Sequence, residues 1–176
     1  AKPRRKEDKM KDIMKVSTVA FNAKWGDKEA NLNRMAGYIE AAAAEGSNLI
    51  VFPEMGLTGY DDEEDKPLKE KMQYKLAETV PGPSSEKIAE LTKKLGVYVA
   101  YGFPERDAEK SDVIYNAACV CGPKGIIGSY RKIHLPYQER TDEEGSYTRL
   151  RGLTMGAAVK PVGLRGKLGY AWNTCI

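Results

Sequence analysis

The first residue able to do chemistry is Glu54, which follows the apolar run Leu49-Ile50-Val51-Phe52 in the segment Phe52-Pro53-Glu54. A carboxylate just beyond a buried strand lies at the edge where open α/β sheets collect ligands. Burial there can raise its pKa and make it a general base. Taken alone, the segment fits a helix-capping or salt-bridged surface glutamate better than a catalytic one.

A second reactive side chain is Lys132, which lies among apolar and aromatic residues in Ser129-Tyr130-Arg131-Lys132-Ile133-His134-Leu135. A lysine in such surroundings can stabilise an oxyanion. Taken alone, this segment favours a surface lysine whose aliphatic stem is covered and whose ammonium reaches water.

Together with a cysteine late in the chain, these segments resemble the nitrilase superfamily of carbon-nitrogen hydrolases. Residues 52–60, FPEMGLTGY, are similar to the catalytic-glutamate segment of that family, and residues 128–135, GSYRKIHL, to its catalytic-lysine segment. The two occur in family order at about family spacing. Further matches are VPGP, YGFPE and YNAA at residues 80–83, 101–105 and 115–118. The resemblance covers residues 16 to 135 well.

The resemblance implies an α/β fold, the layered αββα sandwich of the nitrilase type, with no metal and no organic cofactor. It implies that Glu54 removes a thiol proton and that the thiolate attacks a carbonyl or nitrile carbon, while Lys132 holds the developing negative charge. Water then hydrolyses the thioester. The implied substrate is a small amide, carbamoyl or nitrile compound, and residues 131–136 favour amide or carbamoyl. Family members commonly pair through helices, which implies a homo-oligomer.

The expected nucleophile is Cys175, although its spacing departs from the family pattern. Residues 166–172, GKLGYAW, are similar to the approach to the family's cysteine, but the fourth place after Gly169 is Asn173. Cys175 lies two residues later, which in a strand keeps the face but moves the sulfur roughly 6–7 Å along it. A β-bulge would absorb the difference.

A further carboxylate completes the predicted site. Glu144-Gly145-Ser146-Tyr147 is similar to the Glu-x-x-Tyr stretch of the family, whose glutamate helps to position the substrate and the lysine. Glu139 is the competing candidate. Either residue also fits a solvated loop charge.

Strand and helix patterns alternate along the chain in a way that can position these residues. The patterns predict strands at 13–21, 49–52 and 97–101, helices from Asp27 to about Glu45 and from Pro83 to Gly96, and a β-hairpin formed by 116–120 and 126–130. Strand, helix and strand in succession predict parallel strands, and a later antiparallel pair completes a layered sheet. Residues 61–74, acidic and then mixed in charge, are expected to form a surface excursion.

The three cysteines are too few for a disulfide scaffold and fit a reducing compartment, so a cytoplasmic location is expected. Cys119 and Cys121 are expected to point to opposite faces of one strand, as small core and edge residues. Zinc is not expected, because there is one histidine and no pair of CxxC units.

Composition indicates a soluble domain. Of 176 residues, 30% are charged and 41% hydrophobic. The net charge of +3 is too small to imply a nucleic-acid partner, and no apolar run reaches the about 18 residues that a membrane span needs. Residues 1–12 are expected to be a flexible charged arm before a domain from 13 to 176.

The end of the sequence has an unusual composition. Residues 145–176 contain no aspartate or glutamate, so the domain is expected to be partial and atypical after about residue 150. Two hypotheses follow. The first is an enzyme that hydrolyses non-peptide carbon-nitrogen bonds, and the alternative is a non-catalytic nitrilase-like fragment or regulatory subunit that has lost its working nucleophile.

Overall fold

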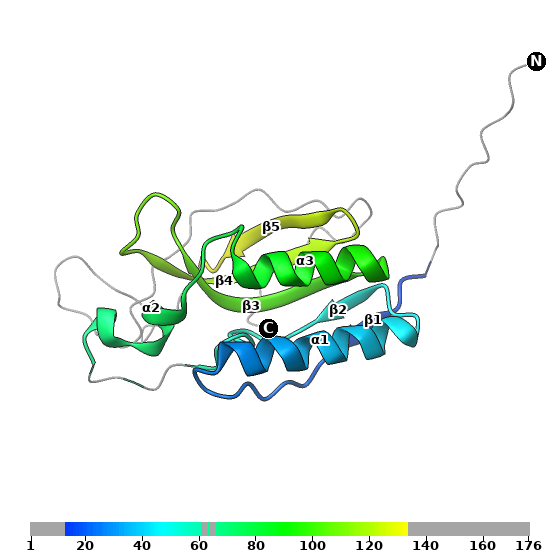
Figure 1. Ribbon diagram of the computed structural model, residues 1–176, viewed down its shortest axis with the longest axis horizontal. Helices are drawn as coiled ribbons and strands as arrows, with labels where there is room; N and C mark the ends of the chain where they lie inside the picture. The colour runs from blue at the N-terminus through cyan, green and yellow to red at the C-terminus, as the bar shows by residue number, and fades with distance from the viewer. Residues whose placement is uncertain (1–12, 61–62, 64–65, 134–176) are drawn as a thin grey trace, which may run out of the picture.

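The computed structural model describes residues 13–60, 63 and 66–133. Strands and helices alternate up to the third strand, after which two further strands follow directly (Figure 1). In chain order the elements are β1 (Val16–Thr18), α1 (Lys28–Ala44), β2 (Leu49–Val51), the 3-10 helix η1 (Leu68–Glu70), α2 (Met72–Leu76), α3 (Pro83–Leu95), β3 (Tyr98–Arg106), β4 (Ile114–Gly122) and β5 (Gly125–Arg131).

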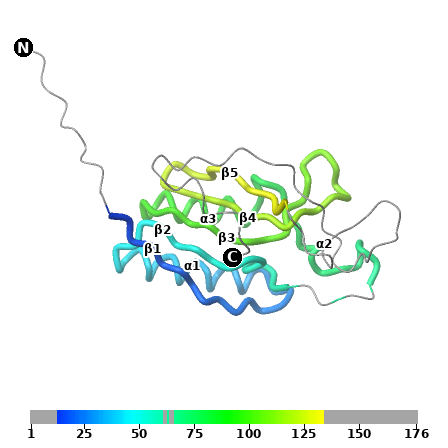
Figure 2. Tube along the Cα trace, turned by 180° about the vertical axis from the view of Figure 1, so that it is seen from behind, coloured from blue at the N-terminus to red at the C-terminus, as the bar shows by residue number. Residues whose placement is uncertain are grey.

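The five strands form one mixed sheet in the order β1-β2-β3-β4-β5, as Figure 2 shows from the other side. β1, β2 and β3 are parallel, and β3, β4 and β5 are antiparallel. The α/β class, the parallel strands with helical crossovers and the later antiparallel hairpin are therefore confirmed. Among the described residues, no helix is long and apolar enough to cross a membrane.

The two long helices begin and end where the sequence predicts. The Asp27 side chain accepts a hydrogen bond from the backbone N–H of Ala30 at 3.1 Å, which caps α1. α3 begins with Pro83, whose fixed φ suits the first helical position. It ends at Gly96, which adopts the left-handed conformation that a glycine tolerates without strain.

The hydrophobic core lies between one face of the sheet and these two helices, which lie side by side (Figure 1). Met35 and Ile39 of α1 and Ile88 of α3 pack there against Ile50 and Phe103 of the sheet. The two helices therefore bury one face of the sheet.

The first strand is shorter than expected. The pattern at 13–21 predicts a buried strand, whereas β1 covers only Val16–Thr18 and pairs only with β2. As the edge strand of the described sheet it is largely exposed, and its backbone pairing reaches only one residue further, where the Val19 N–H donates to the Val51 carbonyl at 2.9 Å.

The expectation that residues 61–74 form a surface excursion is wrong in its second half. η1 and α2 lie there, and Lys71, Met72 and Gln73 are buried. The Gln73 amide donates to the Gly59 carbonyl at 2.7 Å and accepts from the Thr58 hydroxyl at 3.0 Å. These contacts attach α2 to the segment after β2. The mixed charge of residues 61–74 gives no sign of this attachment in the sequence.

The expectation that Cys119 and Cys121 point to opposite faces is also wrong. Successive residues of a strand alternate, so residues two apart share a face. Both thiols are fully buried, with their sulfur atoms 4.0 Å apart, although the β4–β5 register shifts between Val120 and Cys121.

A glycine in β3 allows the chain after β2 to pass close to the sheet. A Cβ on Gly102 would lie 2.6 Å from the Glu54 Cα and 2.6 Å from the Met55 backbone nitrogen. The Gly102 carbonyl also accepts from the Leu57 N–H at 3.2 Å. Since a real Cβ cannot occupy that space, the backbone position of Glu54 depends on this glycine.

We therefore expect Gly102→Ala to lower the free energy of unfolding by about 1–3 kcal/mol, the usual cost of overpacking. Gly37→Ala is the matched control, because a Cβ there meets nothing within 4 Å and helix α1 should gain about 0.5–1 kcal/mol. Urea unfolding of the two variants measures both changes. A neutral Gly102→Ala would contradict the close approach.

Candidate active site

Glu54 leaves the sheet in a sharp turn directly after β2. The Phe52 N–H still pairs with the Ala100 carbonyl at 2.9 Å, and the Gly56 N–H then folds back onto the Pro53 carbonyl at 3.2 Å. Met55 has a φ of 52°, in the left-handed region that a methionine seldom adopts. The turn places the Glu54 carboxylate beyond the carboxyl end of the strand.

Lys132 reaches the same place from β5. Its backbone N–H donates to the Asn116 carbonyl at 2.7 Å, so strand-like pairing continues one residue beyond Arg131. Its Nζ lies 2.8 Å from the Glu54 Oε1, and the two side chains are 16% and 15% exposed. The two charged side chains to which the resemblance gives roles in one reaction are therefore in direct contact.

Two further side chains bind the Glu54 carboxylate. The Asn116 amide donates to Oε1, beside the Lys132 ammonium, and the Tyr60 hydroxyl donates to Oε2 at 2.9 Å. Sequence reasoning gave neither residue a role. The only signal was that both lie inside matching segments, residues 52–60 and 115–118.

These contacts determine the charge of Glu54. Burial raises the pKa of its carboxyl, but the hydrogen bonds from Lys132, Asn116 and Tyr60 outweigh burial and lower the pKa below its usual value. The expected rise in pKa is therefore wrong. Glu54 is a carboxylate at neutral pH and can accept a proton from a group that displaces one of its donors.

The other predicted site residues, Cys175 and Glu144 with its competitor Glu139, lie outside the described residues. Cys119 and Cys121 are described, and their burial withholds them from any substrate. The hydrogen bond between them raises the pKa of the Cys121 thiol and lowers that of the Cys119 thiol. Burial, which both share, therefore argues against either as the nucleophile.

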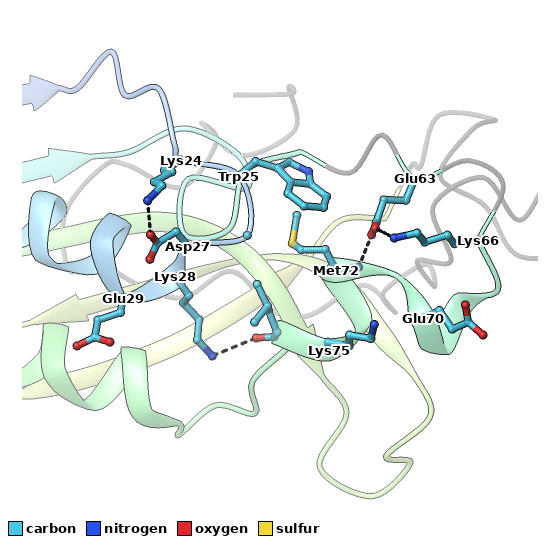
Figure 3. A pocket seen from close by; sticks show the side chains of 12 residues that line it. Lys24, Trp25, Asp27, Lys28, Glu29, Glu63, Lys66, Glu70, Met72 and Lys75 are labelled. Atoms are coloured by element: carbon cyan, nitrogen blue, oxygen red, sulfur yellow. Dashed lines mark hydrogen bonds and ion pairs between the residues drawn. The ribbon is translucent and has the colours of Figure 1, made fainter.

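Among residues 13–60, 63 and 66–133, no group of three histidine, cysteine, aspartate or glutamate side chains is arranged to hold a metal ion. A groove of about 760 Å³ lies between the segment before α1 and the η1–α2 region (Figure 3). Trp25 and Met72 line it, and Lys28 Nζ donates to the Leu76 carbonyl at 3.3 Å across it. Neither Glu54 nor Lys132 lines this groove, so it is separate from the candidate site.

Comparison with known families agrees with this arrangement. The family model of carbon-nitrogen hydrolases matches residues 15–171. The chain belongs to the carbon-nitrogen hydrolase family. Both segments that supply Glu54 and Lys132 fall inside the matched range.

Individual relatives support the same family. A nitrilase from Pyrococcus abyssi is 35% identical over 129 residues, which cover 73% of this chain and 46% of that protein. The human omega-amidase NIT2 is 34% identical over 110 residues, covering 61% of this chain and 36% of that protein. This carbon-nitrogen hydrolase chain thus spans less than half the length of either relative.

A solved structure has the same fold. The crystal structure of Saccharomyces cerevisiae Nit3, a member of branch 10 of the nitrilase superfamily, aligns with a TM-score of 0.62 and 26% identity. The alignment covers 82% of this chain and 49% of that one. The nitrilase-type α/β fold is therefore shown for this carbon-nitrogen hydrolase chain.

The lowered pKa of Glu54 has a consequence for stability. The Glu54 carboxyl group binds a proton less tightly in the folded state than in the unfolded chain, so the carboxylate stabilises the fold above about pH 4.5. This stabilisation is lost as the pH falls through the pKa of the folded state. We expect Glu54→Gln to be less stable than wild type at about pH 7, and the difference to shrink toward about pH 3.

Urea unfolding at several pH values measures this difference, with Glu40→Gln on the exposed side of α1 as a control for losing one carboxylate. A Glu54→Gln difference that stays constant or widens toward acid pH would contradict the assigned hydrogen bonds.

Proposed function

We propose that this chain carries the acid-base half of an amidohydrolase that breaks the carbon-nitrogen bond of a small amide or carbamoyl compound through a cysteine thioester. The observation that carries the proposal is the 2.8 Å contact between Lys132 Nζ and Glu54 Oε1 at the carboxyl edge of the sheet. Family membership supports it.

Glu54 is the proposed general base. A carboxylate at neutral pH can take the proton of a thiol, and the thiolate then forms a bond to the substrate carbon. When the tetrahedral intermediate collapses, the carbon-nitrogen bond breaks and the leaving nitrogen takes the proton back from Glu54. The same carboxylate then removes a proton from the water that hydrolyses the thioester.

Lys132 is the proposed oxyanion stabiliser. Its ammonium has more than one N–H group, so one can remain on Glu54 while another donates to the oxygen that becomes negative. Since Lys132 and Glu54 are both largely buried, this charge acts in a medium where it is stronger than in water.

Cys175 is the proposed nucleophile, and Glu144 the proposed carboxylate that positions the substrate and Lys132. The similarity to an omega-amidase supports an amide as substrate, and residues 131–136 support amide or carbamoyl over nitrile. A homo-oligomer in a reducing compartment such as the cytoplasm, with no metal or organic cofactor, completes the proposal.

The proposal is tested by ammonia release from small amides, carbamoyl compounds and nitriles. We expect turnover by the wild-type chain, loss of turnover in Cys175→Ala, and a fall in kcat of at least about a hundredfold in Glu54→Gln, since a general base contributes that much. Cys119→Ala is the matched control for removing a thiol, and should retain turnover because its sulfur is buried.

Two results would overturn parts of this account. Full activity in Cys175→Ala would refute the nucleophile. No turnover by the wild-type chain on any of the three compound classes would favour the non-catalytic relative instead.

A further inference from the structure

Arg131, the residue before Lys132, is held by three side chains. Its Nε and Nη2 donate to the Glu105 Oε1 at 2.8 and 2.6 Å, and its Nη1 donates to the Asp107 Oδ2 at 3.1 Å. Its guanidinium carbon lies 3.8 Å from the centre of the Tyr115 ring. We call Glu105, Asp107, Tyr115 and Arg131 the arginine clamp.

The arginine clamp and the candidate site occupy opposite faces of the same strands. Glu105 pairs with Tyr115, and Arg131 pairs with Ala117, a core residue, so their side chains share the face that the helices cover. Asn116 and Lys132 each follow a clamp residue directly. Alternation therefore sends these two side chains to the other side, where Glu54 accepts from both.

The clamp is attached to a hydrogen-bonded loop. Asp107 accepts from the backbone N–H groups of Glu109 and Lys110, at 2.9 and 3.0 Å, and from the Tyr115 hydroxyl at 3.0 Å. The two backbone hydrogen bonds, followed by that of Tyr115 and the charge of Arg131, lower the pKa of Asp107 to about 2. Asp107 is thus an anion fixed on the loop between β3 and β4.

Glu105 makes the clamp dependent on Arg131. Its side chain is 5% exposed, and its Oε2 has no hydrogen-bond partner among the described residues. A buried carboxylate is costly unless it is paired. Arg131 supplies the pairing through Oε1, so the Glu105 side chain on β3 holds the end of β5 across the intervening strand β4.

We propose that Arg131 is a positioning residue, which acts through the arginine clamp to hold the end of β5 so that Lys132 meets Glu54. β5 is an edge strand of the described sheet, and the Lys132 N–H continues its pairing with β4 one residue beyond Arg131. That Lys132 then serves catalysis rests on the proposed function, but its placement by Arg131 does not.

Arginine is required because the clamp uses its shape as well as its charge. A planar guanidinium can donate to two carboxylates while it stacks on a ring, whereas a lysine ammonium is a point charge without a flat face. Arg131→Lys therefore keeps the charge and removes the clamp geometry.

The test is an NMR pH titration that follows the signal of the Glu54 carboxyl carbon. This signal is assigned by its absence from the spectrum of Glu54→Gln. In Arg131→Lys, Lys132 should move off Oε1 while burial remains, so the proton affinity of Glu54 should rise about tenfold, as expected for one lost charge-assisted hydrogen bond. Arg34→Lys is the matched control, because Arg34 also stacks on a ring, that of Phe21, and donates to the Asn22 carbonyl.

A Glu54 titration in Arg131→Lys equal to that of wild type and Arg34→Lys would overturn the proposal. If Arg131→Lys does not fold, Asp107→Asn decides it, because it removes one carboxylate of the clamp and should shift the titration of Glu54 in the same direction by less. An unshifted titration in that variant would overturn it as well.

Kinetics separate this inference from the proposed function. Where the wild-type chain is active, Arg131→Lys should lower kcat about tenfold and leave KM unchanged, since the clamp contacts no substrate. Where the wild-type chain is inactive, the proposed function fails and the titration still decides the role of Arg131.

Discussion

The Glu54 carboxylate is the acceptor on which the described arrangement depends. Lys132 and Asn116, both distant in the sequence, donate to one of its oxygens, and Tyr60, six residues away, donates to the other. A largely buried carboxylate is costly unless its oxygens are paired, so the site requires all three donors to reach Glu54. The same pairing keeps it ionised, which is the state that a general base needs.

The fold supplies each donor by a separate route. Gly102 lets the turn after β2 press against β3, which brings Glu54 over the strands that carry Asn116 and Lys132. Buried hydrogen bonds between Thr58, Gln73 and Gly59 hold the chain immediately before Tyr60. Each donor therefore reaches the carboxylate from a segment that is itself held by buried contacts, which is how rigid elements preorganise a site.

The helix ends and the two charged residues of the site could be predicted from the sequence, because they depend on neighbouring residues. Asp27, Pro83 and Gly96 mark helix ends because capping depends on neighbouring residues alone, and the motifs containing Glu54 and Lys132 identify both charged groups. The hydrogen bond from Asn116 to Glu54 could not be predicted, because it joins residues 62 positions apart and no motif gives Asn116 a role. The lowered pKa of Glu54 follows from its donors, and burial alone would have suggested the opposite shift.

The central claim is that Glu54 and Lys132 serve a thiol of this chain that becomes acylated. The most direct measurement is acid quenching of the wild-type chain during incubation with a small amide, followed by peptide mass spectrometry. The account predicts a mass increase equal to the acyl group on the peptide containing Cys175, which disappears in Glu54→Gln. An acyl group on Cys119 or Cys121, or turnover without any acylated cysteine, would contradict it.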